Sequence, residues 1–194
     1  MCLNPYGNGF FSAGADTLLV EWDLNQEDGV MRAKLDSACY ALCSTQEYIL
    51  AGTQKGNLSV FDLKFNLFKF LNVSDSPIFD ILFDQERFLV GCGDGCLRVF
   101  NCDFELIKTL QVSNKSLRQI IVYKTGFALA CSDGKITILD TNLEIDDVLL
   151  AHDGSVFSLA YDPNTGKLFS GGKDARINFY DNLIQKETLN AHLL

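Results

Sequence analysis

Apolar and polar positions alternate along the chain in short runs, and the pattern is clearest over residues 155–189. Residues 155–161 alternate and predict a first strand, and the segment 162–166, with Pro163 and Gly166, predicts a turn. Residues 167–171 and 176–180 predict two further strands around a tight turn at 172–175, and residues 184–189 predict a fourth. No window has the apolar spacing of a helix. We therefore expect an all-β protein built of four-stranded antiparallel meanders.

The same unit recurs along the whole chain. Five times, a turn rich in Gly and Asp is followed by an aromatic residue or Leu and then by Asp or Asn. The closing pairs are Trp22-Asp23, Phe61-Asp62, Phe100-Asn101, Leu139-Asp140 and Tyr180-Asp181, spaced by 39, 39, 39 and 41 residues. Such a period indicates one supersecondary unit copied along the chain. We place the copies in a single domain or fragment, 1–194, at approximately 1–36, 37–73, 74–112, 113–150 and 151–190.

The motifs of the last copy resemble those of a known family. Ala151-His152, then Ser170-Gly171-Gly172-Lys173-Asp174, then Phe179-Tyr180-Asp181 follow the pattern of the WD-repeat (WD40) β-propeller. The first copy matches in Ser12-Ala13-Gly14-Ala15-Asp16 ahead of Trp22-Asp23. The resemblance implies a β-propeller of four-stranded antiparallel blades, of which about five are present.

We interpret the chain as an incomplete seven-bladed ring. The alternative is a closed five-bladed ring, and in our alignment Met1 falls in the column of Leu159, partway through a first strand. An incomplete ring would expose apolar blade faces, so we expect self-association through open blade edges.

In the resembling family, a His, a Ser or Thr, an Asp and a Trp form a hydrogen-bonded structural group in each blade. The positions that match this group are His152, Ser170, Asp174 and Tyr180 in the fifth copy, and Ser12, Asp16 and Trp22 in the first. The middle copies have Ala51, Val90 and Leu129 at the Ser position and no His, so they must depend on apolar packing. His152, Asp174 and Ser170 could also be interpreted as a hydrolytic triad, but their spacing follows the repeat. We predict no catalytic residue.

Four residues recur every 39 positions just inside the first strands and are the candidates for partner binding: Tyr40, Phe79, Arg118 and Phe157. Alternation directs them away from the main packing layer, and aromatic residues and Arg are frequent interface hot spots. The competing interpretation is that these side chains wedge neighbouring blades apart.

We therefore expect a non-enzymatic protein–protein interaction scaffold that binds a partner on the narrow face of the propeller. The alternative is a propeller enzyme or small-ligand binder using the central channel, for which only His152 and His192 are available. A third interpretation is a purely architectural segment of a larger protein.

Charge and cysteine content limit the classes of partner and the cellular location that we expect. The formal net charge is −9 and the basic residues are scattered, so we expect no nucleic-acid or membrane partner and a protein or peptide partner with basic character. The seven cysteines include no CxxC pair, which is typical of reduced thiols and favours a cytoplasmic location. We predict no cofactor and no metal site, because a zinc site at Cys92 and Cys96 would need two more ligands.

Overall fold

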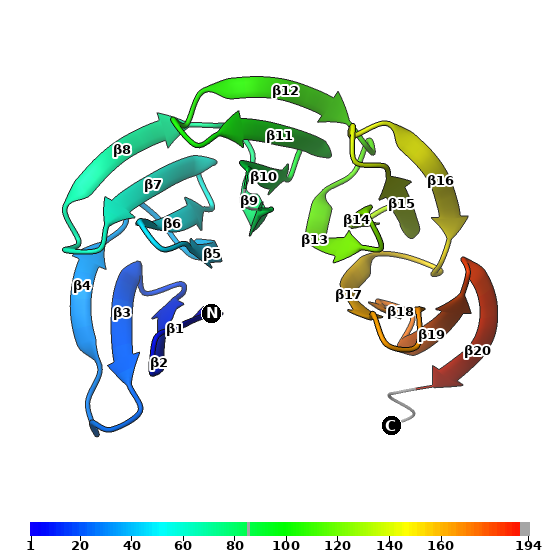
Figure 1. Ribbon diagram of the computed structural model, residues 1–194, viewed down its shortest axis with the longest axis horizontal. Helices are drawn as coiled ribbons and strands as arrows, with labels where there is room; N and C mark the ends of the chain where they lie inside the picture. Colours follow the sequence, from blue (N-terminus) through cyan, green and yellow to red (C-terminus); the bar gives the residue numbers. More distant parts are fainter. Residues whose placement is uncertain (85, 191–194) are drawn as a thin grey trace. The chain divides into compact units, whose positions relative to one another are not determined.

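The computed structural model describes residues 1–84 and 86–190 and contains five four-stranded antiparallel sheets. In each sheet the strands pair in chain order, as Figure 1 shows. Within the described residues every regular element is a strand. The predictions of an all-β protein and of four-stranded blades are therefore confirmed.

We call the sheets blades 1 to 5. Blade 1 contains β1 (Cys2–Tyr6), β2 (Gly9–Ala13), β3 (Leu18–Asp23) and β4 (Val30–Lys34). Blade 2 contains β5 (Cys39–Ser44), β6 (Tyr48–Thr53), β7 (Asn57–Asp62) and β8 (Leu67–Asn72). Blade 3 contains β9 (Ile78–Phe83), β10 (Arg87–Cys92), β11 (Cys96–Asn101) and β12 (Leu106–Gln111). Blade 4 contains β13 (Leu117–Tyr123), β14 (Gly126–Cys131), β15 (Lys135–Leu139) and β16 (Ile145–Leu150), and blade 5 contains β17 (Val156–Asp162), β18 (Lys167–Gly172), β19 (Arg176–Asp181) and β20 (Ile184–Asn190).

The chain forms two compact units. Unit 1 comprises Met1–Cys92 and Arg98–Lys108, and unit 2 comprises Gly93–Leu97 and the chain from Thr109 onward. In unit 1, one apolar cluster lies between blades 1 and 2 and a second between blades 2 and 3. In unit 2, one cluster joins blades 4 and 5. The second strands of blades 2, 3 and 4 are buried along most of their length, which explains their nearly continuous apolar sequences.

The closing Asp or Asn of the repeat organises the turn between the third and fourth strands. In blade 2, Asp62 Oδ1 accepts the backbone N–H groups of Lys64 at 2.8 Å and Asn66 at 2.9 Å. These bonds hold Phe65 at a φ of 63°, a left-handed conformation that a bulky residue adopts only when its surroundings fix it. The Asn66 side chain also donates to Asp62 and lowers the pKa of that carboxyl.

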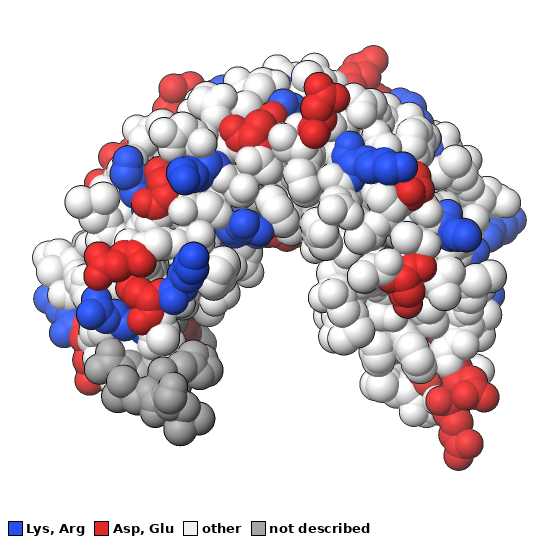
Figure 2. Space-filling view, turned by 180° about the vertical axis from the view of Figure 1, so that it is seen from behind, with Lys and Arg blue, Asp and Glu red and all other residues white. Residues whose placement is uncertain are grey.

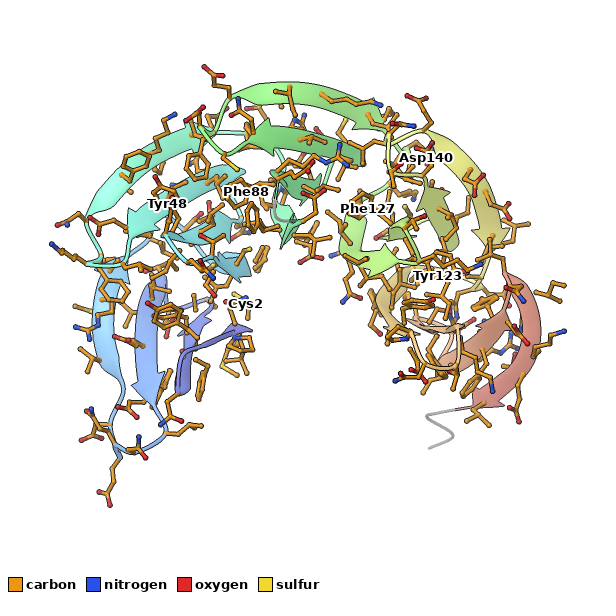
Figure 3. All side chains as sticks on the ribbon, in the orientation of Figure 1. Cys2, Tyr48, Phe88, Tyr123, Phe127 and Asp140 are labelled. Atoms are coloured by element: carbon orange, nitrogen blue, oxygen red, sulfur yellow. The ribbon has the colours of Figure 1, made fainter. Side chains whose placement is uncertain are left out.

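The same turn recurs at Asn101 and at Asp140, which is labelled in Figure 3. The repeat motif therefore marks a backbone structure that needs a side-chain acceptor at this position.

The start of blade 1 differs from our alignment. Leu3, rather than Met1, lies opposite Ser12, just as Leu159 lies opposite Ser170 in blade 5. The alignment was wrong because the last copy is two residues longer between its first and second strands, as the final spacing of 41 residues indicates. Strand β1 consequently pairs with β2 over five residues.

His192, which repeats the position of His152, lies outside the described residues. Residues 1–84 and 86–190 contain no helix that is long and apolar enough to span a membrane.

Candidate partner-binding residues

The four predicted binding residues all occupy one backbone irregularity. In blade 2, Cys39 pairs with Thr53 and Ala41 pairs with Gly52, so Tyr40 is the extra residue of a β-bulge. Phe79, Arg118 and Phe157 are the extra residues of equivalent bulges in blades 3, 4 and 5. A bulge re-aims the side chain of its extra residue and is common beside functional sites. We call these four the bulge residues.

In unit 1, the bulge residues of neighbouring blades contact each other. The rings of Tyr40 and Phe79 stack with centroids 5.7 Å apart and planes only 8° apart. Tyr40 is still 38% exposed and Phe79 is half-buried. The pair is compatible with both interpretations of the sequence, wedging and partner binding, because it joins blades 2 and 3 and also presents aromatic surface to solvent.

In unit 2, the bulge residues are one cation and one exposed ring. Arg118 Nε donates to Ser132 Oγ at 2.8 Å, and partial burial lowers the pKa of its guanidinium. Phe157 is 50% exposed and lines a groove of about 250 Å³ with Arg176 and Ile177. A half-exposed Phe beside a groove is available to a partner side chain, and its wedging role is correspondingly small.

An acidic column precedes the bulge residues, and the sequence analysis missed it. Four residues before each bulge lies an exposed Asp36, Asp75 or Asp153, and Asn114 takes this position in blade 4. Asp153 Oδ2 lies 3.4 Å from Arg176 and Asp36 Oδ2 accepts a hydrogen bond from Asn57. The 39-residue period that revealed the aromatic column also contains this one. On the side seen in Figure 2, basic side chains are scattered among acidic ones.

The polar group of blade 5 is closed and buried. His152 Nδ1 lies 2.8 Å from Asp174 Oδ1, and Nε2 lies 2.8 Å from Ser170 Oγ. A carboxylate can only accept, so Nδ1 carries the proton and Nε2 accepts from the Ser170 hydroxyl. Burial raises the pKa of Asp174, but hydrogen bonds from His152 and from the Asp153 N–H outweigh it and hold this pKa below its usual value.

Blade 1 contains a partial version of this group. Trp22 Nε1 donates to Ser12 Oγ at 2.8 Å, and Asp16 Oδ1 accepts the Leu18 N–H at 3.2 Å. Tyr180, at the position of Trp22, differs from our expectation, because within the described residues its buried hydroxyl has no hydrogen-bond partner. In the middle blades, Ala51, Val90 and Leu129 are fully buried.

Unit 1 also contains a cavity of about 770 Å³ at the C-terminal ends of the first strands β5 and β9, whereas the bulges lie near their N-terminal ends. It is lined by the loop Ser44–Glu47 and by Tyr48, Phe83, Phe88 and Cys102. Tyr48 and Phe88 are labelled in Figure 3. Over residues 1–84 and 86–190, no cluster of three His, Cys, Asp or Glu side chains could hold a metal ion.

The sequence model of the WD40 repeat, described as "WD domain, G-beta repeat", matches residues 145–181. Residues 145–181 therefore correspond to one WD40 repeat. The match covers His152, Ser170, Asp174 and Tyr180, the positions of the polar group in blade 5. The comparison with curated proteins gave no match.

Solved structures resemble the chain over 94% to 98% of its length. The WD40 β-propeller domain of Doa1 superposes with a TM-score of 0.81 at 20% identity, covering 94% of this chain and 64% of that one. A chain of the Mitotic Checkpoint Complex gives 0.85 at 15% identity, covering 97% and 63%. The computationally designed protein Ika8 gives 0.80 at 18% identity, covering 98% and 61%. The chain therefore spans between 61% and 64% of the length of these structures, and identities this low establish the fold alone.

Proposed function

We propose that the chain is a non-enzymatic, cytoplasmic interaction scaffold that binds a protein or peptide partner through the bulge residues on the narrow face of its blades. The observation that carries the proposal is the repetition of one irregularity. Four blades place their extra first-strand residue at a bulge, and three of these residues are aromatic and one is Arg. Bulges cost regular pairing, and binding gives a reason to keep them at the same position.

The surroundings of the bulge residues favour a partner with basic side chains. The exposed Asp36, Asp75 and Asp153 lie four residues before the aromatic bulge residues Tyr40, Phe79 and Phe157. Lys and Arg side chains suit a surface that has both aromatic rings and exposed carboxylates, because their stems pack on rings and their charges meet carboxylates. Because these carboxylates are exposed, their contribution to binding should weaken as the salt concentration rises.

Burial of the polar group supports a role without catalysis. A triad nucleophile must reach its substrate, but the His152 side chain is 0% exposed and Ser170 is 2% exposed. The three side chains satisfy one another inside blade 5, as expected of a structural group. The WD40 fold is in general a binding scaffold, and we extend that role to this chain.

Affinity capture tests the binding proposal. Wild-type protein is compared with a double variant, Arg118→Ala with Phe157→Ala, and with a control, Phe70→Ala, which removes a ring that is 51% exposed on the fourth strand of blade 2. We expect the double variant to lose the captured partner while keeping its melting temperature, and the control to retain it. A partner that binds all three proteins equally would refute the assignment of the bulge residues.

We also propose that blade 5 can associate with a second copy. Phe169 and Ile177 lie on the face of blade 5 that corresponds to Phe11 and Leu19 of blade 1. In blade 1 these side chains are 0% exposed against blade 2, whereas Ile177 is 36% exposed and Phe169 is half-buried. Sedimentation should show a concentration-dependent dimer that Ile177→Lys removes. A wild-type protein that sediments as a monomer at all concentrations would exclude this association.

A further inference from the structure

Blades 1 and 2 bring two cysteine sulfurs into contact. Strand β1 lies beside β5, and Cys2 Sγ is 3.6 Å from Cys39 Sγ. Figure 3 labels Cys2 at the start of β1. Cys39 is completely buried, whereas Cys2 is only partly covered. The two residues are separated by 37 positions in sequence, so blade packing creates this proximity.

The repeat explains the geometry. Cys39 occupies the position directly before the bulge, which Ile78, Leu117 and Val156 fill in the other blades, all 0% exposed. Cys2 occupies the position of Ala41 in blade 2. The position of Cys2 holds Asp80, Gln119 and Ser158 in blades 3, 4 and 5, so the pair of thiols is particular to the contact between blades 1 and 2.

We propose that Cys2 and Cys39 form an oxidation site, at which a hydroperoxide such as hydrogen peroxide converts the two thiols into a disulfide between blades 1 and 2. The sulfurs must approach by about 1.5 Å to reach disulfide bonding distance. Rotation of the partly covered Cys2 side chain at the edge of blade 1 can supply this movement.

The chemistry proceeds in two balanced steps. The Cys2 thiolate attacks one peroxide oxygen, the O–O bond breaks, and Cys2 becomes a sulfenic acid while hydroxide leaves and takes a proton to form water. The Cys39 sulfur then attacks the Cys2 sulfur, the S–O bond breaks, and the departing hydroxide takes the Cys39 proton to form a second water. Two thiols are oxidised by two electrons in total, and one peroxide is reduced to two waters.

The environments of the two sulfurs assign these roles. The hydrogen bond with Cys39 is the main cause that lowers the pKa of Cys2, which favours the thiolate at the more accessible sulfur. The same interaction, followed by burial, raises the pKa of Cys39. The Ala41 carbonyl, 3.3 Å from Cys39 Sγ, is an alternative acceptor for the single S–H of Cys39. Cys2 is therefore the sulfur that meets the oxidant, and Cys39 is the one that resolves the sulfenic acid.

The link would form one residue before Tyr40. Oxidation would thus tether β1 directly behind a bulge residue and close a loop of the chain that contains all four strands of blade 1. Closing a loop of this size raises the melting temperature of a small domain by roughly 5 °C or more.

The test uses the full chain with Cys102→Ser, because Cys102 is the exposed cysteine and would form links between molecules. The protein is treated with hydrogen peroxide, alkylated, digested without reduction and analysed by mass spectrometry. We expect a linked peptide containing Cys2 and Cys39, the loss of two thiols per chain, and a higher melting temperature that dithiothreitol reverses. Oxidation of Cys2 to a sulfinic acid while Cys39 stays alkylatable, or no loss of either thiol, would overturn the proposal.

Two variants copy the other blades and should therefore fold. Cys2→Ala introduces the residue of Ala41, and Cys39→Val that of Val156. We expect Cys2→Ala and Cys39→Val each to abolish both the link and the thermal shift. A thermal shift that survives Cys2→Ala would mean that another cysteine is responsible and would refute the site.

Discussion

Blades 3 and 5 have the same four strands but are stabilised by different chemistry at equivalent positions. In blade 5, Ser170 is buried and hydrogen-bonded to His152, which Asp174 orients. In blade 3 the position of Ser170 is Val90, which packs in an apolar cluster with Phe88 and Phe104. The polar group is therefore one way to fix a blade and apolar packing is another. The match to the family model covers residues 145–181, which contain the polar group, although the other sheets have the same topology.

The largest loss of stability is expected from disrupting the apolar cluster that contains Phe88 of blade 3. Phe88 is 2% exposed and stacks on Phe83 with centroids 4.6 Å apart and on Phe104 at 5.1 Å. Phe88→Ala should lower the free energy of unfolding by about 3–5 kcal/mol, because it removes buried area and leaves a cavity. Denaturant unfolding measures this loss. Phe68→Ala, at a ring that is 53% exposed, is the control and should cost far less.

The next largest loss of stability is expected from disrupting the polar group of blade 5. His152→Ala would leave the buried Ser170 hydroxyl and the Asp174 carboxylate without their shared partner, and should cost about 2–3 kcal/mol. The loss should be local to unit 2, so hydrogen exchange of β17 and β18 should accelerate more than that of β5 and β6. Equal acceleration in both units would contradict the view that the group stabilises blade 5 in particular.

Acid should remove the contribution of the ionised Asp174 carboxylate to the stability of blade 5. The folded state lowers the pKa of Asp174 below its usual 3.8, so its stabilising contribution is complete above that value and disappears as the pH falls through the lowered pKa. The stability difference between wild type and Asp174→Asn should therefore be largest near neutral pH and shrink in strong acid. Thermal unfolding between about pH 7 and pH 2 measures this trend. A difference that is constant over this range would show that the ionised carboxylate does not stabilise the blade.

The smallest effect concerns the aromatic residue that closes the blade. Because the buried Tyr180 hydroxyl has no hydrogen-bond partner in the described structure, Tyr180→Phe should raise the stability by about 1 kcal/mol or leave it unchanged. Phe61 and Phe100 already fill this position in blades 2 and 3. Thermal unfolding with Tyr48→Phe as the control tests it. A clear loss of stability at Tyr180→Phe would indicate a hydrogen bond that the structure does not contain.

The fold could be predicted from the sequence because its signals are local. Alternation defined the strands, and the closing Asp or Asn marked turns in which Asp62, Asn101 and Asp140 accept backbone N–H groups. The recurrence of Tyr40 and Phe157 with the period is also visible in the sequence, and their role in binding stays a prediction.

The bulges and the contact between the Cys2 and Cys39 sulfurs could not be predicted from the sequence. A bulge is defined by the register of two strands, and alternation along one strand does not reveal it. The contact of Cys2 with Cys39 depends on how neighbouring blades pack, and the alignment error at β1 hid the equivalence of Cys2 with Ala41. The missing hydrogen bond of Tyr180 depends on where its hydroxyl lies, which only the structure shows.

Site-specific photo-crosslinking tests the central claim most directly. A benzoylphenylalanine at Phe157, which is 50% exposed at a bulge, is compared with the same probe at Phe70, which is 51% exposed on β8. We predict that the captured partner crosslinks from position 157, that its crosslinked peptide contains Lys or Arg, and that position 70 gives no comparable product. Efficient crosslinking from position 70 with none from position 157 would contradict it.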